Sequence, residues 1–295
     1  MADRSMRGVF PILQTPFDEN GEILFEDLRS EVDFAIRSGV HGLGIAFGSE
    51  VNKLSDHERD QVLSTVVDQA AGRAKVVMNT GAQSTILTIH YSKAAQVLGA
   101  NGVMISPPTA GNPPVAEVRR HYLAVAEATS LPIFMQDLAG ATLAPSLMAD
   151  LAKAHENLCY AKVETLPTPH RFAEAAASAS KRLSLFGGAN GVFFIEELQR
   201  GGVGTMQGIA ICDVVRRVWD RFQSGDEGSA AEIWDRYQPL VKLYSMSENQ
   251  SYYVAKEILR KRGVISKACP RLPARKPDDG IYRQIAMLME RLEIS

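Results

Sequence analysis

Cysteine is scarce in this sequence, and the side chains that bind metals form no recognisable pattern. The 295 residues include three widely spaced cysteines, Cys159, Cys212 and Cys269. This odd-numbered set matches neither a disulfide framework nor a metal-site spacing, and it is typical of a reducing cytoplasm. The six histidines likewise form no His-x-x-x-His pair. We therefore expect neither a metal nor another cofactor in the site.

Net charge is low and long apolar runs are missing. A net charge of −2 gives no electrostatic reason to expect nucleic acid or an anionic membrane surface as a partner. No apolar run approaches the roughly 18 residues that a membrane-spanning helix needs. The N-terminal segment MADRSMRGVF is charged and lacks the apolar core of a secretory signal. With 45% apolar and 22% charged residues, the sequence is that of an ordinary globular protein, which we expect in the cytoplasm.

Strand-like and helix-like segments alternate along most of the chain. The eight segments predicted as strands are 8–14, 41–47, 75–79, 102–106, 132–136, 160–164, 183–186 and 202–206. Alternation of this kind implies an α/β fold with a parallel sheet, and eight units match a (β/α)8 TIM barrel. An open, doubly wound sheet is the alternative, but no G-x-G-x-x-G motif follows the first strand, where a dinucleotide would need it.

The pattern changes after Ser224. Three helices are predicted there, at 230–245, 250–261 and 281–292, with no strand between them. No low-complexity linker separates them from the preceding units. We therefore expect residues 1–224 to form the barrel and 225–295 to form a helical extension packed on it.

One lysine lies in an apolar segment that is predicted to be a strand. Lys162 is at the centre of the sequence NLCYAKVET, and burial there disfavours the ammonium form and lowers the pKa of a lysine. A neutral lysine is an amine nucleophile that forms Schiff bases with carbonyl substrates. Glu164, two residues further on, leaves the same face of a strand. The alternative is an edge strand on which both side chains form a solvated stripe.

The position of Lys162 and Glu164 favours a functional role. In TIM barrels the active site lies at the C-terminal ends of the strands, which is where these two residues are predicted. Other predicted strand ends place further candidate residues at the same rim: Gly48, Ser49, Asn79, Gln136 and Gly187. Each of these is also an ordinary turn residue. Together they predict a polar mouth around one buried lysine.

Several short motifs occur in a characteristic order. They are TPF at 15–17, a glycine-containing turn before Leu54-Ser55, TGAQST at 80–85, PIFMQD at 132–137, Lys162, and the stretch from GG to GVGTM at 187–206. Their order and spacing resemble the dihydrodipicolinate synthase/N-acetylneuraminate lyase superfamily, which are lysine Schiff-base lyases built as (β/α)8 barrels with a helical C-terminal extension. The resemblance covers almost the whole chain. It implies that Lys162 is the Schiff-base lysine and that the chain forms a homo-oligomer, a tetramer or a dimer.

Departures from the superfamily pattern narrow the expected activity. Synthase and lyase members carry a tyrosine on strand five, and this chain has Gln136, whose amide cannot relay a proton near neutral pH. This replacement argues against dihydrodipicolinate synthase activity itself. The tyrosine pair after strand four is replaced by Pro108-Thr109, so we expect each subunit to complete its own site. Gln-Asp after strand five together with Lys-x-Glu-Thr on strand six resembles members of the L-2-keto-3-deoxyarabonate dehydratase type.

A mechanism follows from these residue types. Lys162 would attack the C2 ketone of a 2-oxo acid, and the resulting iminium would acidify the C3–H bond. Glu164 would take that proton, and Gln136 would orient a hydroxyl or a water. Backbone N–H groups of Gly48 and Ser49 would hold the C1 carboxylate, because N–H groups at a helix start favour anions. Asn79 and Gly187 are further candidate contacts to the substrate.

Three functions remain open on this sequence. The first is dehydration of a sugar-derived 2-keto-3-deoxy acid. The second is retro-aldol cleavage of a similar acid to pyruvate and an aldehyde, because the same iminium also drives C3–C4 cleavage. The third is non-catalytic binding of a 2-oxo acid. Product analysis separates the first two, and a binder would consume no sugar acid.

Overall fold

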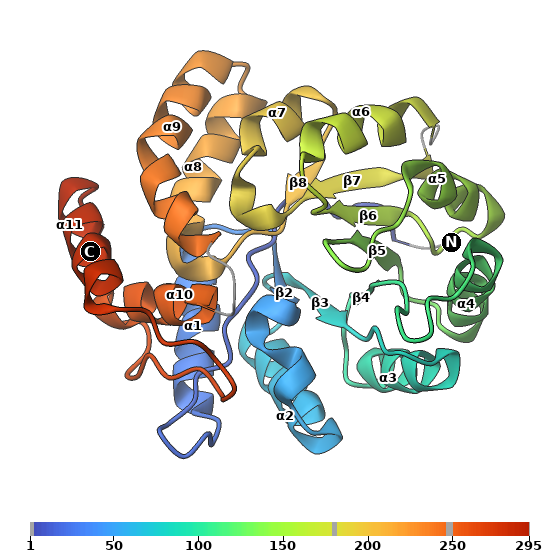
Figure 1. Cartoon of the computed structure of the whole chain (residues 1–295), viewed down its shortest axis with the longest axis horizontal. Coiled ribbons are helices and arrows are strands. Elements are labelled where there is room, and N and C mark those ends of the chain that lie inside the picture. Colours follow the sequence, from blue (N-terminus) through green and yellow to red (C-terminus); the bar gives the residue numbers. More distant parts are fainter. Residues whose placement is uncertain (1–2, 179–181, 246–249, 295) are drawn as a thin grey trace.

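The computed structural model describes residues 3–178, 182–245 and 250–294, and eight parallel strands form a barrel at its centre (Figure 1). The strands are β1 Gly8–Val9, β2 Gly42–Ile45, β3 Lys75–Asn79, β4 Gly102–Ile105, β5 Ile133–Asp137, β6 Tyr160–Val163, β7 Ser184–Gly187 and β8 Gly204–Thr205. They pair in the order β1-β8-β7-β6-β5-β4-β3-β2. A parallel bridge between Ile12 and Gly44 joins the chain after β1 to β2. The predicted (β/α)8 TIM barrel is confirmed.

Strand β1 is shorter than the predicted 8–14. Regular pairing ends at Val9, and Pro11, which has no N–H group, cannot donate to a strand ladder. Ile12 continues the barrel through isolated bridges to Gly44 and Gly208. The segment is therefore an interrupted strand. It still runs to the end of the barrel at which the other strands have their C-terminal ends.

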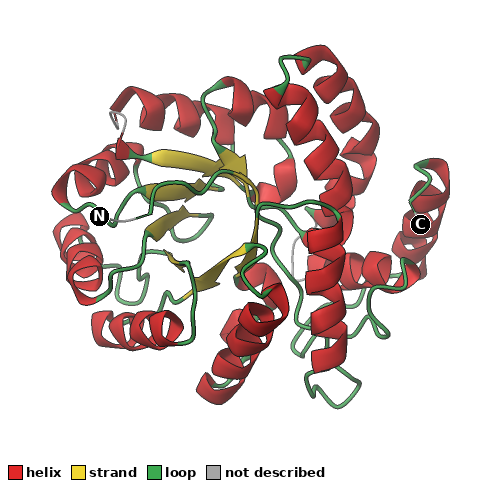
Figure 2. Ribbon diagram, turned by 180° about the vertical axis from the view of Figure 1, so that it is seen from behind, coloured by secondary structure: helices red, strands yellow, loops and turns green. Residues whose placement is uncertain are grey.

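Helices surround the barrel on its outside (Figures 1 and 2), and Figure 1 shows them in the order that the alternation predicts. They are α1 Phe25–Arg37, α2 Asp56–Ala70, α3 Thr85–Val97, α4 Val115–Ala128, α5 Pro145–Ala154, α6 Thr168–Ser178, α7 Phe194–Gln199 and α8 Cys212–Gln223. At the start of α2, Ser55 Oγ accepts from the Glu58 N–H at 3.3 Å and the Glu58 carboxylate accepts from the Ser55 N–H at 2.8 Å. This is the capping box that the S-x-x-E spacing predicts.

Aromatic side chains fill the inside of the barrel at the N-terminal ends of the strands. The rings of Phe134 and Tyr160 stack with centroids 4.5 Å apart, and Phe10 meets Phe186 edge-to-face at 5.4 Å. The Tyr160 hydroxyl accepts from the backbone N–H of Met6 at 3.0 Å and ties the N-terminal segment across this end. Polar side chains that need access to solvent are therefore restricted to the opposite end of the barrel.

Three helices follow the barrel and pack against it: α9 Glu227–Tyr244, α10 Gln250–Lys261 and α11 Asp279–Arg291. Figure 1 shows α9 alongside α8, with α10 below them and α11 at the outer left edge. The Trp234 side chain of α9 is buried and donates to the Gly191 carbonyl in the loop after β7 at 2.9 Å. The Arg262 guanidinium, just after α10, bonds both carboxylate oxygens of Asp213 at 2.9 Å. Among the helices of the described residues, none is both long and apolar enough to cross a bilayer.

Candidate active site at the C-terminal ends of the strands

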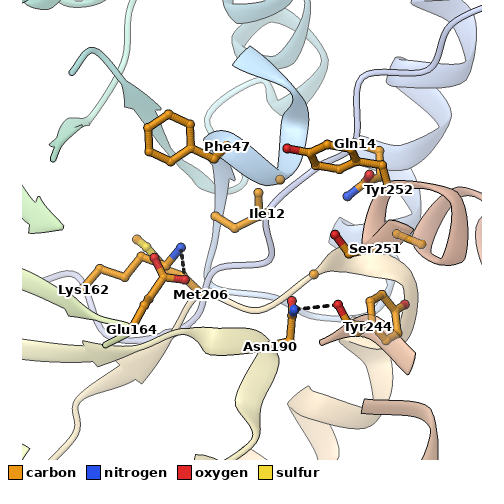
Figure 3. Close-up of a pocket in the computed structure, with 13 residues that line it drawn as sticks. Ile12, Gln14, Phe47, Lys162, Glu164, Asn190, Met206, Tyr244, Ser251 and Tyr252 are labelled. Carbon is orange, nitrogen blue, oxygen red and sulfur yellow. Dashed lines mark hydrogen bonds and ion pairs between the residues drawn. The ribbon is translucent and has the colours of Figure 1, made fainter. Parts of the chain in front are cut away.

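A cavity of about 230 Å³ lies at the C-terminal ends of the strands (Figure 3). Both the barrel and the C-terminal helices line it, through Ile12, Gln14, Phe47, Gly48, Lys162, Glu164, Asn190, Met206, Gly208, Tyr244, Ser251, Tyr252 and Ala255. Of the seven residues that the sequence put forward for the site, Gly48, Lys162 and Glu164 line this cavity.

Strand alternation places Lys162 inside the barrel. Ala161 and Val163 belong to the apolar layer between strands and helices, whereas Tyr160 belongs to the cluster inside the barrel. Because side chains alternate along a strand, Lys162 shares the inner face with Tyr160 and sits above it. The side chain is 4% exposed, and its Nζ lies 3.0 Å from Glu164 Oε1. The polar end of a buried lysine therefore faces a carboxylate and the cavity.

Three donors fix the Glu164 carboxylate. Its Oε1 accepts from the Ala189 backbone N–H at 3.1 Å and is paired with Lys162, while its Oε2 accepts from the Gln136 amide at 2.7 Å. A Cβ on Gly188 would lie 2.4 Å from the Glu164 Cγ, so only glycine leaves room for the carboxylate there. Glu164 is thus held in one place, with one oxygen directed at the Lys162 amine.

Gln136 and Asn79 lie behind Glu164, outside the lining of the cavity. Pairing of β5 with β6 sets Gln136 beside Lys162 in register. The Asn79 side-chain N–H donates to Gln136 Oε1 at 3.3 Å, and this fixes which end of the Gln136 amide faces Glu164. Both side chains are almost fully buried. The structure therefore joins Asn79, Gln136, Glu164 and Lys162 in one chain of polar contacts.

The turn after β2 contributes Phe47 and Gly48 to the cavity. Ser49, which the sequence also put forward, is turned away: its hydroxyl donates to the Leu13 carbonyl at 2.5 Å and accepts from the Ala46 N–H at 3.1 Å. The backbone N–H of Ser49 donates to the Ala46 carbonyl at 2.9 Å. Ser49 therefore shapes the turn, and the surface of the turn that meets the cavity belongs to Phe47 and Gly48.

Gly187 is also outside the cavity. A Cβ at this position would lie 1.8 Å from Oε2 of Glu197 on α7, so Gly187 leaves room for a buried carboxyl on the outer side of the barrel. Thr168 Oγ1 donates to the other Glu197 oxygen at 2.5 Å. Burial raises the pKa of Glu197 to about 8. The two adjacent glycines thus separate two carboxyls, Glu164 on the inner side and Glu197 on the outer side.

Asp137, next to Gln136, has a structural role. Arg171 donates to both of its oxygens, at 2.6 and 2.9 Å. The Leu143 N–H and the Thr165 hydroxyl both donate to Oδ1, at 2.9 Å. The carboxylate therefore anchors the loops after β5 and β6. Within residues 3–178, 182–245 and 250–294, no three His, Cys, Asp or Glu side chains are grouped so that they could hold a metal ion.

Sequence reasoning missed one wall of the cavity. Asn190, in the loop after β7, has a backbone φ of 53° and donates from its amide to the Tyr244 carbonyl at 3.0 Å. Ser251 and Tyr252 reach the cavity from α10 (Figure 3). Burial raises the pKa of Tyr252 to about 12. These residues carry hydroxyl and amide groups, but no local spacing relates them to Lys162.

Comparisons with known proteins cover nearly the whole chain. A model of the dihydrodipicolinate synthetase family matches residues 5–292. The chain is 30% identical to an L-2-keto-3-deoxyarabonate dehydratase of Azospirillum brasilense, covering 97% of this chain and 94% of the relative. It is 32% identical to a 4-hydroxy-tetrahydrodipicolinate synthase of Sorangium cellulosum, covering 99% and 98%.

Solved structures show the same fold. A dihydrodipicolinate synthase of Thermotoga maritima superposes with a TM-score of 0.92 at 24% identity, covering 98% of this chain and 99% of the other. A prophage protein of E. coli K12 from the same family, solved with pyruvate, gives 0.92 at 22% identity, covering 99% and 100%. At these identities the likeness concerns the fold alone.

Proposed function

This chain belongs to the dihydrodipicolinate synthetase family, and we propose that it is a Schiff-base lyase that dehydrates a 2-keto-3-deoxy sugar acid. The observation that carries the proposal is the Lys162 amine, buried at the cavity and 3.0 Å from a Glu164 carboxylate that Gln136 holds in place. The dehydratase relative over 97% of the chain supports the choice of reaction within the family.

The Lys162–Glu164 pair supplies both groups that imine formation needs. A proton passes from the ammonium to Glu164, which leaves a neutral amine and a carboxylic acid 3.0 Å apart. The amine attacks the C2 ketone of the substrate. The ketone oxygen then leaves as water, with one proton from Nζ and one from Glu164. An iminium and a Glu164 carboxylate result, so the total charge of the pair is unchanged.

Dehydration follows at the neighbouring carbons. The iminium draws electrons from C3, and the Glu164 carboxylate takes the C3 proton to give an enamine. The C4 hydroxyl leaves as water with the proton that Glu164 now carries, which restores the carboxylate and leaves a conjugated iminium. Water then releases the dehydrated 2-oxo acid from Lys162. Gln136 keeps the carboxylate in reach of each of these atoms, because its amide donates to Oε2 throughout.

Two parts of the cavity suit the two ends of the substrate. The turn of Phe47 and Gly48 suits the C1 carboxylate, because backbone N–H groups bind anions. Asn190, Ser251 and Tyr252 offer amide and hydroxyl groups to the hydroxylated tail of a sugar acid. The carboxylate contact is therefore assigned to Phe47 and Gly48, and Ser49 is assigned to the turn itself.

A panel of 2-keto-3-deoxy acids tests the proposal. Each acid is incubated with the protein, and the products are analysed for loss of water and for pyruvate plus an aldehyde. We expect the dehydrated 2-oxo acid from at least one member of the panel. Release of pyruvate without dehydration would replace dehydration by retro-aldol cleavage. Binding without any consumption of substrate would replace both by a binding function.

A further inference from the structure

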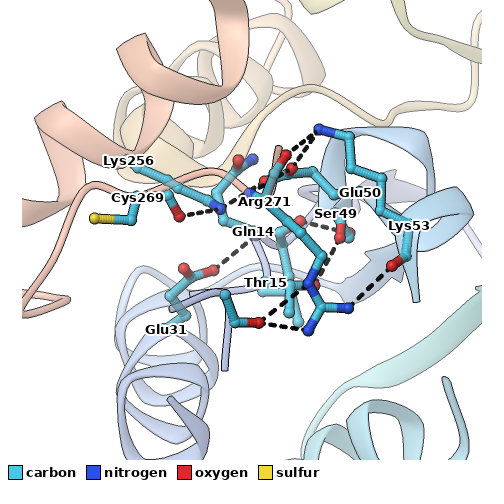
Figure 4. A network of polar contacts seen from close by, with 11 residues as sticks. Gln14, Thr15, Glu31, Ser49, Glu50, Lys53, Lys256, Cys269 and Arg271 are labelled. Atoms are coloured by element: carbon cyan, nitrogen blue, oxygen red, sulfur yellow. Dashed lines mark hydrogen bonds and ion pairs between the residues drawn. The ribbon is translucent and has the colours of Figure 1, made fainter. Parts of the chain in front are cut away.

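A second buried lysine, Lys256, lies in the C-terminal extension within a network of polar contacts (Figure 4). It directly follows Ala255, which lines the cavity. Lys256 on α10 is completely buried, and its Nζ donates to Glu50 Oε1 at 2.6 Å and to the Cys269 carbonyl at 3.0 Å. The same Nζ lies 4.5 Å from the centre of the Phe17 ring. The ammonium of Lys256 is thus surrounded by protein on several sides.

Its partner Glu50 belongs to the barrel and is equally enclosed. The side chain is completely buried, and its Oε2 accepts from Lys53 Nζ at 2.8 Å and from the Arg271 backbone N–H at 3.0 Å. Glu50 also has a φ of 56°, in the left-handed region that non-glycine residues seldom occupy. Such a conformation persists where the surroundings impose it. Lys53, Lys256 and Arg271 together fix this residue.

The Lys256–Glu50 pair connects two walls of the cavity. Glu50 directly follows the turn Phe47–Ser49, whose first two residues line the cavity. Lys256 directly follows Ala255, which lines the cavity from α10 together with Ser251 and Tyr252. A contact of 2.6 Å between these two side chains therefore sets the distance between the turn after β2 and helix α10.

We propose that Lys256 is a positioning residue for the substrate, which holds the Phe47–Glu50 turn against α10 and so fixes the part of the cavity that receives the C1 carboxylate. The inference rests on the proposed function, because that function assigns the carboxylate to this turn. Replacing a buried ion pair by apolar residues of similar volume is often neutral or stabilising, so stability alone does not account for this pair. What the pair adds is a single, directional position of the turn.

The first test separates binding from chemistry. Wild-type protein and Lys256→Met are treated with pyruvate and borohydride over a range of pyruvate concentrations, and labelling of Lys162 is followed by mass spectrometry. We expect the half-saturating pyruvate concentration to rise about tenfold, equivalent to about 1.4 kcal/mol. The labelling rate at saturating pyruvate stays near that of the wild type, because Lys162 and Glu164 are untouched.

Arg262→Met is the matched control. Arg262, whose side chain is 8% exposed, also joins the extension to the barrel through an ion pair with Asp213 at 2.9 Å, but it does not line the cavity. We expect it to lower stability and to leave the half-saturating concentration unchanged. An equal rise in both variants would show that loosening the extension in general weakens binding, and it would overturn the specific role of Lys256.

The double variant Lys256→Met/Glu50→Gln distinguishes positioning from stability. Removing the charge of Glu50 relieves the buried carboxylate that Lys256→Met leaves without its partner, so resistance to urea recovers in part. The turn still lacks its contact with α10, so the half-saturating concentration stays high. Recovery of both quantities together would overturn the proposal, because binding would then follow stability.

A second measurement, hydrogen–deuterium exchange, tests the position of the turn without relying on Schiff-base formation at Lys162. Hydrogen–deuterium exchange of the peptide covering residues 46–54 is expected to accelerate in Lys256→Met and to stay as in the wild type in Arg262→Met. Unchanged exchange in this peptide would overturn the positioning role even if labelling weakened. Failure of wild-type protein to be labelled at Lys162 would instead refute the proposed function, while the exchange experiment would still decide whether Lys256 holds the turn.

Discussion

Two buried lysines of this protein each face a glutamate, yet their surroundings differ. Lys162 is paired with Glu164 at 3.0 Å, and that glutamate is 18% exposed at a cavity. Lys256 is paired with Glu50 at 2.6 Å, and neither side chain is exposed. Lys162 Nζ lies beside the Glu164 carboxylate, whereas Lys256 Nζ contacts a carboxylate, a carbonyl and an aromatic ring. Open space beside the amine, rather than burial, distinguishes the lysine that we propose to be reactive.

Burial alone would therefore favour Lys256, whose side chain is 0% exposed, over Lys162. Burial lowers the pKa of Lys256, and the neighbouring Glu50 opposes that effect by favouring the ammonium. A perturbed pKa is a general sign of a functional site, but structural ion pairs produce it too. Neither side chain of the Lys256–Glu50 pair is exposed, so a substrate carbonyl cannot reach the Lys256 Nζ, and this ammonium is assigned to holding the turn after β2.

The strongest test of this comparison is replacement of each lysine by methionine. We expect Lys162→Met to lose borohydride trapping and turnover completely, because no other amine faces the substrate in the proposed mechanism. Its thermal stability should change little, since Glu164 keeps its contacts with Gln136 and Ala189. Lys256→Met should still be labelled at Lys162 when pyruvate is saturating. Labelling of another lysine in the wild type would contradict the comparison.

Replacement of each glutamate by glutamine tests the acid–base half of the comparison. Glu164→Gln is expected to lose a factor of about 10² to 10⁴ in dehydration, as is usual for loss of a general base. Labelling of Lys162 should still occur but more slowly, because Glu164 also takes and returns a proton during imine formation. Exchange of solvent deuterium into C3, counted per labelled molecule, should stop. Glu50→Gln is the control, with C3 exchange per labelled molecule as in the wild type. Wild-type exchange in Glu164→Gln would mean that the base lies elsewhere.

The two lysine variants should rank in the reverse order for stability, with a larger loss in Lys256→Met than in Lys162→Met. Lys256→Met leaves the buried Glu50 carboxylate without its closest partner, and breaking a buried pair in this way costs about 3–5 kcal/mol in the free energy of unfolding. Lys162→Met should cost much less, because Glu164 is partly exposed. Urea unfolding monitored by circular dichroism measures both. A larger loss for Lys162→Met would mean that the Lys162 pair is the structural one.

The barrel could be predicted from the sequence because each strand carries its own local signal. β3 coincides with the predicted 75–79, and β6 with 160–164 to within one residue. Strand order then places Gln136, Lys162 and Glu164 together, since β5 and β6 are neighbours in a parallel barrel. Lys162 and Glu164 share one strand face, so their contact follows from side-chain alternation.

The rest of the site depends on packing between distant segments. Ser251 and Tyr252 reach the cavity only because α10 packs across the end of the barrel, and no spacing in the sequence sets that arrangement. Glycines pose a related difficulty. Gly187 and Gly188 are adjacent and identical, and only the structure shows that Gly188 accommodates Glu164 while Gly187 accommodates Glu197. The role of each glycine is set by the glutamate that packs against it, and the sequence does not show which glutamate that is.

The smallest effect that we predict concerns a third ion pair beside Lys256, between Glu58 and Arg271. Hydrogen bonds from the Arg271 guanidinium, at 2.6 and 2.9 Å, lower the pKa of Glu58 to about 2. Since this folded-state pKa is below that of the unfolded chain, the pair stabilises the fold fully above about pH 5 and loses its contribution as the pH falls toward 2. The pair is partly exposed to solvent, so we expect a contribution of roughly 1 kcal/mol.

Glu58→Gln makes this contribution measurable and separates it from the buried pair. The variant should unfold at a lower urea concentration than the wild type at pH 7, and the gap should narrow as measurements proceed through pH 5, 4 and 3. Protonation of Glu58 removes the same charge that the substitution removes, so the two proteins converge in acid. Lys256→Met should still be less stable than the wild type at pH 5, because that deficit comes from an unpaired carboxylate in the interior. A stability difference between Glu58→Gln and the wild type that stayed constant from pH 7 to pH 3 would contradict this, because it would show that Glu58 acts through packing and not through its charge.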